Sequence, residues 1–304
     1  MEAPATQGVD VSSISSNAQP PQPSVPLDTH YYLTEGLEGI ERKQYYSTRS
    51  FSNAIDKLHD DFDSGNSSAR QYLVFTSVTQ AQLENIHHFR ETRRRHKSLS
   101  IMYLKNEEVL IVKIIPNCIQ EMTHLGFGTM LHLKTYKMGP AYSLCGLGRT
   151  TFEGILGQKE ADSSFEPDVR RMAANWPTVV FQCGLAESLE RLRVDCRWWL
   201  ENSTEVNIAL LFTFSQAEKR IHIEQWEVLP VPNSPVTHTH SDPLTKQLTK
   251  THEIDIVAGV ASGAPLVLDF QKVFLRPPTP GEGDIVFSVQ ELEKYAARIW
   301  LGAQ

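Results

Sequence analysis

Acidic side chains gather in one short stretch of the sequence. This stretch contains, in order, Lys159, Glu160, Asp162, Glu166 and Asp168. Carboxylate oxygens are the ligands that Mg²⁺ and Mn²⁺ prefer, and a working site also needs room for water and phosphate. A run of charges is more often a solvated loop. The cluster alone therefore favours an acidic surface loop and leaves metal-dependent phosphodiester chemistry as the alternative.

A polar triplet, Gln182-Cys183-Gly184, ends an apolar strand that we predict at residues 179–183. Asp162 lies twenty residues earlier, which suits the return of the chain from one strand to its neighbour. The carbonyl oxygen of Gln182 can bind Mg²⁺ but cannot neutralise the charge of the ion. Glu187, on the following turn, is placed to reach back to the ion. The alternative is that Gln182 only satisfies the polar end of the strand.

Three further groups have simpler interpretations. Glu121 lies near the start of a predicted helix, where stabilisation of the N-terminus is favoured over a place in the site. The basic run at residues 90–97 suits phosphate binding or nuclear import, and equally the solvated end of a helix. His238 and His240 lie in a polar segment without a partner motif, so we expect no metal there.

Composition is that of an intracellular globular protein. The 304 residues carry a net charge of −7 and a pI of about 5.9, which weakens a nucleic-acid-binding interpretation without excluding it. Four cysteines without CxxC spacing predict reduced thiols. The sequence shows no signal-peptide pattern and no apolar run of membrane-spanning length. We therefore expect a nuclear or cytoplasmic location and no membrane partner.

The chain divides into three predicted parts. Residues 1–28 are rich in Ser, Pro and Gln and are expected to be disordered. Residues 29–99 are expected to form an N-terminal helical extension, and residues 100–304 a core with a polar linker near 231–251. Periodicity predicts helices at 48–62, 79–97, 117–137, 187–200 and 289–300, and strands at 71–77, 100–104, 109–115, 142–147, 150–156, 179–183, 206–214, 221–228 and 266–274. This order predicts an α/β or α+β fold, in which a mixed sheet is flanked by helices.

The chain resembles a group of filamentous-fungal proteins with a PD-(D/E)xK, restriction-endonuclease-like core. The motifs that carry the resemblance span roughly residues 100–300. They lie at 120–121 (QE), 159–164 (KEADSS), 182–188 (QCGLAES), 197–200 (RWWL) and 276–284 (RPPTPGEGD). The chain departs from the family pattern in having Gln120 for His, Gln182 for Glu and Ala186 for Ser.

The resemblance implies roles for individual residues. Glu121 and Asp162 would bind Mg²⁺ or Mn²⁺, and position 182 would supply a second carboxylate. Position 184 would hold a lysine in the usual nuclease motif, but it is Gly184 here, and Lys159 is the candidate substitute. Since Gln182 removes one negative charge from the ligands, such a site should bind Mg²⁺ less well.

Two functions from different classes follow from these residues. The first is a metal-dependent nuclease acting on DNA or RNA, with Asp162, Gln182, Lys159 and Glu187 as catalytic residues. The second is a catalytically inactive module of the same fold that binds protein partners or regulates them, or an accessory protein of a fungal gene cluster. A fold does not by itself confer an activity, so the geometry of the site must separate the two.

Overall fold

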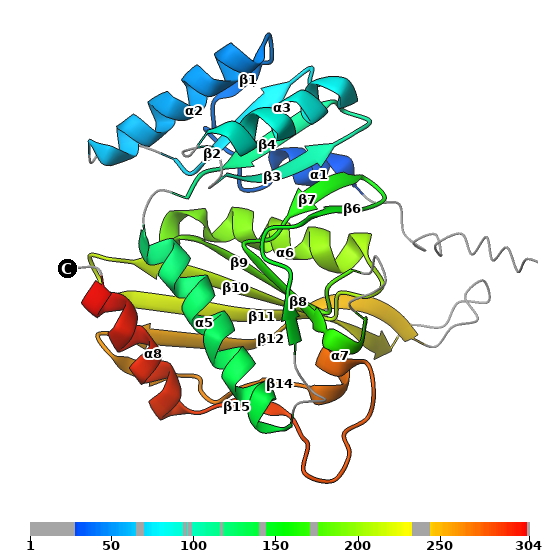
Figure 1. The fold of residues 1–304 in the computed structure, drawn as a ribbon, viewed down its shortest axis with the longest axis vertical. Helices are drawn as coiled ribbons and strands as arrows, with labels where there is room; N and C mark the ends of the chain where they lie inside the picture. The colour runs from blue at the N-terminus through cyan, green and yellow to red at the C-terminus, as the bar shows by residue number, and fades with distance from the viewer. Residues whose placement is uncertain are drawn as a thin grey trace, which may run out of the picture.

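The computed structural model describes residues 28–64, 70–93, 96, 99–115, 118–139, 144–170, 176–232 and 244–302. Within these ranges the chain forms a six-stranded sheet, a seven-stranded sheet and a two-stranded sheet (Figure 1). Both large sheets are mixed, since β1 runs parallel to β2 and β9 runs parallel to β10 while the other pairs are antiparallel. The predicted fold class, a mixed sheet flanked by helices, is confirmed.

The elements are as follows. The helices are α1 (Thr29–Thr34), α2 (Thr48–Asp63), α3 (Gln80–Thr92), α5 (Cys118–Lys137), α6 (Leu189–Asn202), α7 (Phe270–Phe274) and α8 (Val289–Gly302). The six-stranded sheet has the order β1 (Arg42–Gln44), β2 (Tyr72–Thr76), β4 (Val109–Lys113), β3 (Ser100–Leu104), β7 (Gly157–Glu160) and β6 (Thr151–Glu153). The seven-stranded sheet has the order β13 (Val260–Ser262), β12 (Leu244–Val257), β11 (Arg220–Pro232), β10 (Ile208–Ser215), β9 (Val179–Leu185), β8 (Ser163–Pro167) and β5 (Leu144–Gly146). The remaining pair is β14 (Leu266–Leu268) with β15 (Ile285–Phe287).

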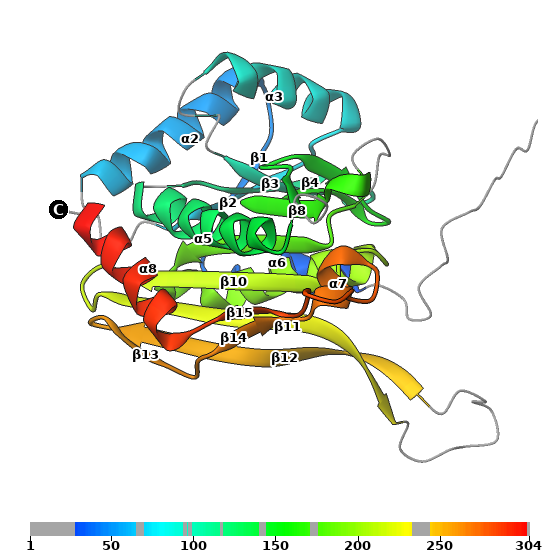
Figure 2. The same ribbon diagram turned by 60° about the horizontal axis from the view of Figure 1, so that its bottom comes forward.

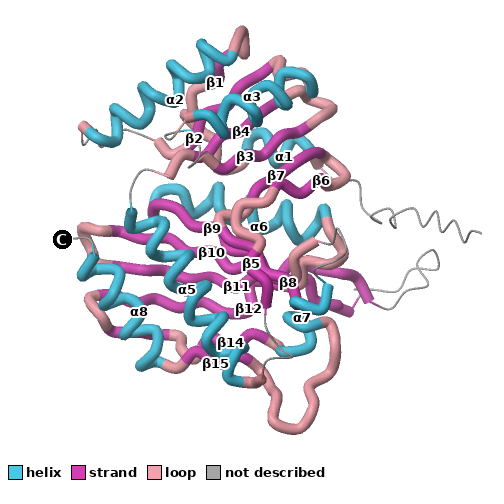
Figure 3. The backbone as a smooth tube through the Cα atoms, in the orientation of Figure 1, coloured by secondary structure: helices cyan, strands magenta, loops and turns pink. Residues whose placement is uncertain are grey.

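Side chains alternate between the two faces of the seven-stranded sheet, and each face packs into a different core. In β9, Phe181 and Cys183 pack into the core that α5 and α8 cover, whereas Val180 points to the opposite face, towards α6. Because side chains alternate along a strand, Gln182 shares the α6 face with Val180. Figure 2 shows α2 and α3 on the outer side of the six-stranded sheet, and Figure 3 shows α5 beside α8.

The core on the α6 face joins the two large sheets. Val74 and Ile111 from the six-stranded sheet share a cluster with Trp198 and Trp199 of α6 and with Leu211 of β10. Both tryptophans are completely buried. The functional candidates on the α6 face therefore lie between two sheets rather than on an open surface.

The structure differs from the sequence expectations in several places. The segment 29–99 contributes β1 and β2 to the six-stranded sheet, where β2 pairs with β4, so the boundary expected at residue 99 falls inside this sheet. β12 begins at Leu244, so much of the polar segment 231–251 is strand, and residues 233–243 lie outside the described ranges. The strand expected at 266–274 ends at Leu268, because Asp269 accepts a hydrogen bond from Lys272 N and begins α7.

The local signals were sufficient for several elements. The hairpin of β3 and β4, the strand β9 and the helix α6 are confirmed within a few residues of their expected ends. Asp28, the last residue of the expected tail, caps α1 by accepting a hydrogen bond from His30 N, and residues 1–27 lie outside the described ranges. No helix among the described residues is both long enough and apolar enough to cross a membrane.

Candidate functional site

Asp162 lies where the chain crosses from one large sheet to the other. β7 of the six-stranded sheet ends at Glu160, and β8 of the seven-stranded sheet begins at Ser163. The backbone N–H of Asp162 donates to the carbonyl of Phe181 in β9 at 3.1 Å. Its carboxylate Oδ2 accepts a hydrogen bond from Cys183 N at 2.6 Å. The crossing therefore holds Asp162 against the polar end of β9, beside Gln182, as the sequence spacing predicts.

Lys113, at the end of β4, reaches into the same place from the other sheet. Its ammonium Nζ lies 2.5 Å from Asp162 Oδ2, 3.3 Å from Gln182 Oε1 and 3.1 Å from the carbonyl oxygen of Cys183. An ammonium group has three donors, so these three oxygens satisfy it completely. The exposed fraction is 3% for Lys113, 2% for Asp162 and 1% for Gln182. We call Lys113, Asp162, Gln182 and the Cys183 carbonyl the ammonium cluster.

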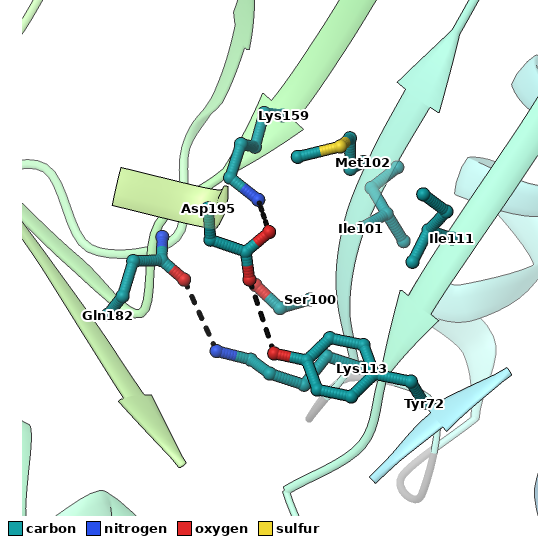
Figure 4. Close-up of a pocket in the computed structure, with 9 residues that line it drawn as sticks. All are labelled: Tyr72, Ser100, Ile101, Met102, Ile111, Lys113, Lys159, Gln182 and Asp195. Atoms are coloured by element: carbon teal, nitrogen blue, oxygen red, sulfur yellow. Dashed lines mark hydrogen bonds and ion pairs between the residues drawn. The ribbon is translucent and has the colours of Figure 1, made fainter. Parts of the chain in front are cut away.

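Lys159, the expected substitute lysine, makes a separate ion pair. Its Nζ lies 2.8 Å from Oδ1 of Asp195 in α6, and Tyr72 donates to Asp195 Oδ2 at 3.2 Å (Figure 4). Burial opposes ionisation of the Asp195 carboxyl, but the cations of Lys159 and Arg191 outweigh burial and lower its pKa. Lys159 thus stabilises α6 against β7 instead of contacting Asp162.

A small cavity separates the two ion pairs. Its volume is about 10 Å³, which is close to the minimum that one water molecule occupies. Lys113, Gln182, Lys159 and Asp195 are among the residues that line it (Figure 4). The cavity has no space for a phosphate group.

The neighbours of Gly184 explain why a glycine lies at this position. A Cβ atom on Gly184 would lie 2.9 Å from Gln71 Oε1 and 3.0 Å from a methyl carbon of Leu192. Gln71 cannot easily move, because its Oε1 accepts from Leu185 N at 2.7 Å and from Ser188 Oγ at 3.0 Å. A side chain at position 184 therefore does not fit this packing.

Gln120 forms hydrogen bonds at the same strand end. It donates to the carbonyl of Cys183 at 2.8 Å, and its Oε1 accepts a hydrogen bond from Gln71 Nε2 at 2.8 Å. Two neutral amides thereby connect β2 and α5 to the end of β9. This network satisfies buried polar groups without supplying any charge that could hold a cation.

Glu121 is held by Arg149 and His124. Its carboxylate pairs with Arg149, and its Oε2 lies 3.2 Å from His124 Nε2. His124 in turn lies 2.8 Å from Ser163 Oγ through its Nδ1. The hydrogen bond with His124, followed by the charge of Arg149, lowers the pKa of Glu121 to about 2. The structure therefore brings Glu121 near Asp162 only indirectly, through His124 and Ser163.

The other carboxylates of the 159–168 cluster do not form a solvated loop. Glu160 is buried in a bidentate ion pair with Arg90, with both N–O distances at 2.9 Å, so the basic run 90–97 begins with a core residue. Glu166 is buried in β8, and burial raises its pKa, whereas Asp168 is exposed. The loop expectation fails because residues 157–160 and 163–167 are strands of two sheets.

Glu187 lies in the short 3-10 turn Ala186–Ser188 and is exposed. This position puts its side chain outside the buried ammonium cluster. The structure thus brings Asp162 and Gln182 together, pairs Lys159 with Asp195 and Glu121 with Arg149, and exposes Glu187 to solvent. Their proposed roles in catalysis remain predictions.

A second group of possible metal ligands lies on β11 and β12. One ligand atom each from His222, Glu224 and Glu253 lies within 4.8 Å of the others. Glu224 already accepts two hydrogen bonds from Arg193 and one from Trp226 Nε1, and Lys250 Nζ lies 3.4 Å away. The cations and donors of the protein thus occupy the Glu224 carboxylate, so this group is a charge network between the strands and α6.

Mg²⁺ does not fit the ammonium cluster as it stands. One observation favours a further ligand, since Asp162 Oδ1 is buried without a hydrogen-bond partner among the described residues. Against it, Lys113 holds the other carboxylate oxygen, Gln182 brings no charge, and Mg²⁺ requires near-octahedral coordination by oxygens. The ion and the ammonium would compete for the same atoms.

Comparison with known proteins yields a distant structural likeness. No protein-family model matches the chain, and no curated protein matches it. The fold is similar to a crystal structure described as a "putative nuclease belonging to DUF820" from Anabaena variabilis ATCC 29413. The two share 9% sequence identity at a TM-score of 0.40, over 69% of this chain and 98% of that chain. A likeness of this size leaves the function of the present chain undecided.

Lys113 is the residue that sequence reasoning missed. The signal was a single lysine in the apolar run of residues 109–115, inside a predicted hairpin strand. Lysine is almost never fully buried unless it is paired. A charge in that position therefore implied a buried carboxylate elsewhere in the chain, but sequence alone does not show that the partner is Asp162.

Proposed function

We propose that this chain is a catalytically inactive module with a restriction-endonuclease-like fold, which binds a partner or regulates one. The observation that carries the proposal is the ammonium of Lys113, bound to Asp162 Oδ2 at 2.5 Å and to Gln182 Oε1 at 3.3 Å. These are the side chains that would have to bind the catalytic cation.

The closed environment of the cluster supports the same conclusion. Metal-assisted cleavage of a phosphodiester requires a cation, an attacking water and a phosphate in one place. The cavity beside Gln182 has a volume of about 10 Å³, enough for about one water molecule. The residues of the cluster are at most 3% exposed. A nucleic-acid backbone could reach Asp162 only if the two sheets separated.

A second candidate, a nuclease that uses Lys113 itself, rests on the same ion pair. Lys113 lies beside Asp162 and Gln182, so it could supply the ammonium that the usual motif places at position 184. In that case the ammonium would have to leave Asp162 Oδ2 when a metal ion binds. The burial of all three side chains favours the inactive module.

The decisive experiment incubates the purified protein with Mn²⁺ or Mg²⁺ and single- and double-stranded DNA and RNA. We expect no cleavage above that of an Asp162→Ala variant. We also expect no rise in melting temperature with either ion. A functional site would raise stability by about 2.7 kcal/mol at a metal concentration a hundred times the Kd. Cleavage by the wild-type protein that a folded Asp162→Ala variant lacks would establish the nuclease instead.

The partner class is tested separately. The net charge of −7 favours a protein partner over DNA or RNA, because nonspecific nucleic-acid binding depends on neutralising phosphate charges. Fluorescence anisotropy with labelled DNA and RNA measures the affinity for nucleic acid at several salt concentrations. A tight complex that weakens steeply with salt would favour a nucleic-acid partner.

A further inference from the structure

We infer that the Lys113 ammonium takes the place of a divalent cation and that Gln182 is its matched partner, so the two residues form one metal-free unit with Asp162. This inference rests on the proposed inactive function. It explains how a lysine ammonium and the neutral amide of Gln182 occur together in this buried site. Lys113 is a positioning residue in this account, since it fixes the ends of β8 and β9 instead of touching a substrate.

The geometry is that of a cation held by oxygens from the sheet crossing and from the end of one strand. The acceptors are a carboxylate, a side-chain amide and a backbone carbonyl, at 2.5, 3.3 and 3.1 Å from Lys113 Nζ. They come from the sheet crossing at Asp162 and from the end of β9, whereas the lysine comes from β4 of the other sheet. The ammonium therefore joins the two sheets at the point where a bound ion would lie between Asp162 and Gln182.

Charge balance explains why glutamine suits position 182. The buried unit of Lys113, Gln182 and Asp162 contains one positive and one negative formal charge. A divalent cation with carboxylates at positions 162 and 182 would also be neutral. Exchanging only the cation, or only the residue at position 182, leaves an uncompensated buried charge, which is costly. Lys113 and Gln182 should therefore act as a coupled pair.

The test replaces Lys113 and Gln182 together. The variant Lys113→Ala with Gln182→Glu removes the ammonium, vacates its volume and supplies the second carboxylate. We expect Mn²⁺ to raise the melting temperature of this double variant by about 5 °C or more at saturating concentration. Electron paramagnetic resonance of Mn²⁺ should show one bound ion per chain. The wild-type protein should show neither effect.

Two control variants isolate the cluster. Lys159→Ala with Gln182→Glu removes the other lysine that lines the cavity and keeps Lys113, so it should not gain the response to Mn²⁺. Addition of Asp162→Asn to the responsive double variant should abolish the response. A response shared by both lysine variants would show that the glutamate alone recruits the ion, and it would overturn the role given to Lys113.

The remaining outcomes also decide the question. A folded double variant that binds no Mn²⁺ overturns the inference, and so does a double variant that stays unfolded with and without the ion. A double variant that folds only with Mn²⁺ supports it, because the ion then supplies what Lys113 supplied. Cleavage by the wild-type protein would overturn the proposed function instead, so the two failures are distinguishable.

Discussion

A buried lysine and a buried aspartate stabilise each other only as a pair. Lys113 and Asp162 are 3% and 2% exposed, and their charged atoms lie 2.5 Å apart. Taking two charges out of water is expensive, and close contact with full hydrogen bonding offsets the cost. Gln182 adds an acceptor without adding a charge. At this scale the neutral amide of Gln182 completes the ammonium cluster.

Replacement of Asp162 by Asn should therefore destabilise the protein strongly. The change leaves the Lys113 ammonium buried without its counter-charge, and we expect a loss of about 3–5 kcal/mol in the free energy of unfolding. Urea unfolding followed by circular dichroism measures it. Glu187→Gln, at an exposed position, serves as the control and should change stability by less than about 0.5 kcal/mol. Equal effects of the two changes would contradict the pairing.

The contacts between the candidate site residues were predictable from the sequence only in part. The proximity of Asp162 and Gln182 followed from their spacing around two neighbouring strands. The pairing of Lys113 with Asp162 did not, because it joins residues 49 positions apart on different sheets. Lys159 and Glu121 have other partners, Asp195 and Arg149, which lie 36 and 28 positions away in the sequence.

At the scale of elements, the end of β9 is fixed by side chains from β2, α5 and α6. Gln71, just before β2, accepts hydrogen bonds from Leu185 N and Ser188 Oγ, and Gln120 of α5 donates to Cys183 O. Leu192 of α6 fills the space above Gly184. The strand end is therefore packed too closely for the lysine that the usual motif would place there.

Gly184→Ala should test this packing directly. The new methyl group would lie 2.9 Å from Gln71 Oε1 and 3.0 Å from Leu192, and such overpacking costs about 1–3 kcal/mol. Gly283→Ala is the matched control, because a Cβ there meets nothing within 4 Å. Thermal unfolding of both variants measures the difference. An unchanged melting temperature for Gly184→Ala would show that Gln71 and Leu192 can move aside.

Elements with strong local signals were predictable, and elements set by long-range pairing were not. The spacing of Phe51, Ile55 and Leu58 placed α2, and Ser47 caps it. No strand was predicted at β12, Leu244–Val257, because much of this segment is polar and follows a Pro/Thr-rich stretch. Its pairing with β11 outweighs that composition. The same competition turned the expected acidic loop into β7 and β8.

At the scale of the whole molecule, one core unites the two large sheets. The cluster on the α6 face takes residues from β2, β3, β4, β9 and β10 together with the two buried tryptophans. β2 also completes the six-stranded sheet by pairing with β4. Stability in this part of the chain is therefore shared between segments on both sides of residue 99.

A fragment of residues 100–304 should not fold independently. It lacks β2, so β4 becomes an open edge, and it lacks Gln71, so polar groups at the end of β9 lose their partner. We expect the fragment to show no cooperative thermal transition. Residues 28–304 form the control and should melt as the full chain does. A cooperative transition in the shorter fragment would support the boundary at residue 99.

The buried amine of Lys113 also has a consequence for covalent chemistry at lysine. Acylating reagents and acetyl-transferring enzymes need a neutral, solvent-reachable amine, whereas this one is 3% exposed and bound to three oxygens. Lys159 is equally enclosed. These two amines become reactive only when the sheets part. Their labelling therefore reports the opening of the interior, while the labelling of exposed lysines reports only the presence of the reagent.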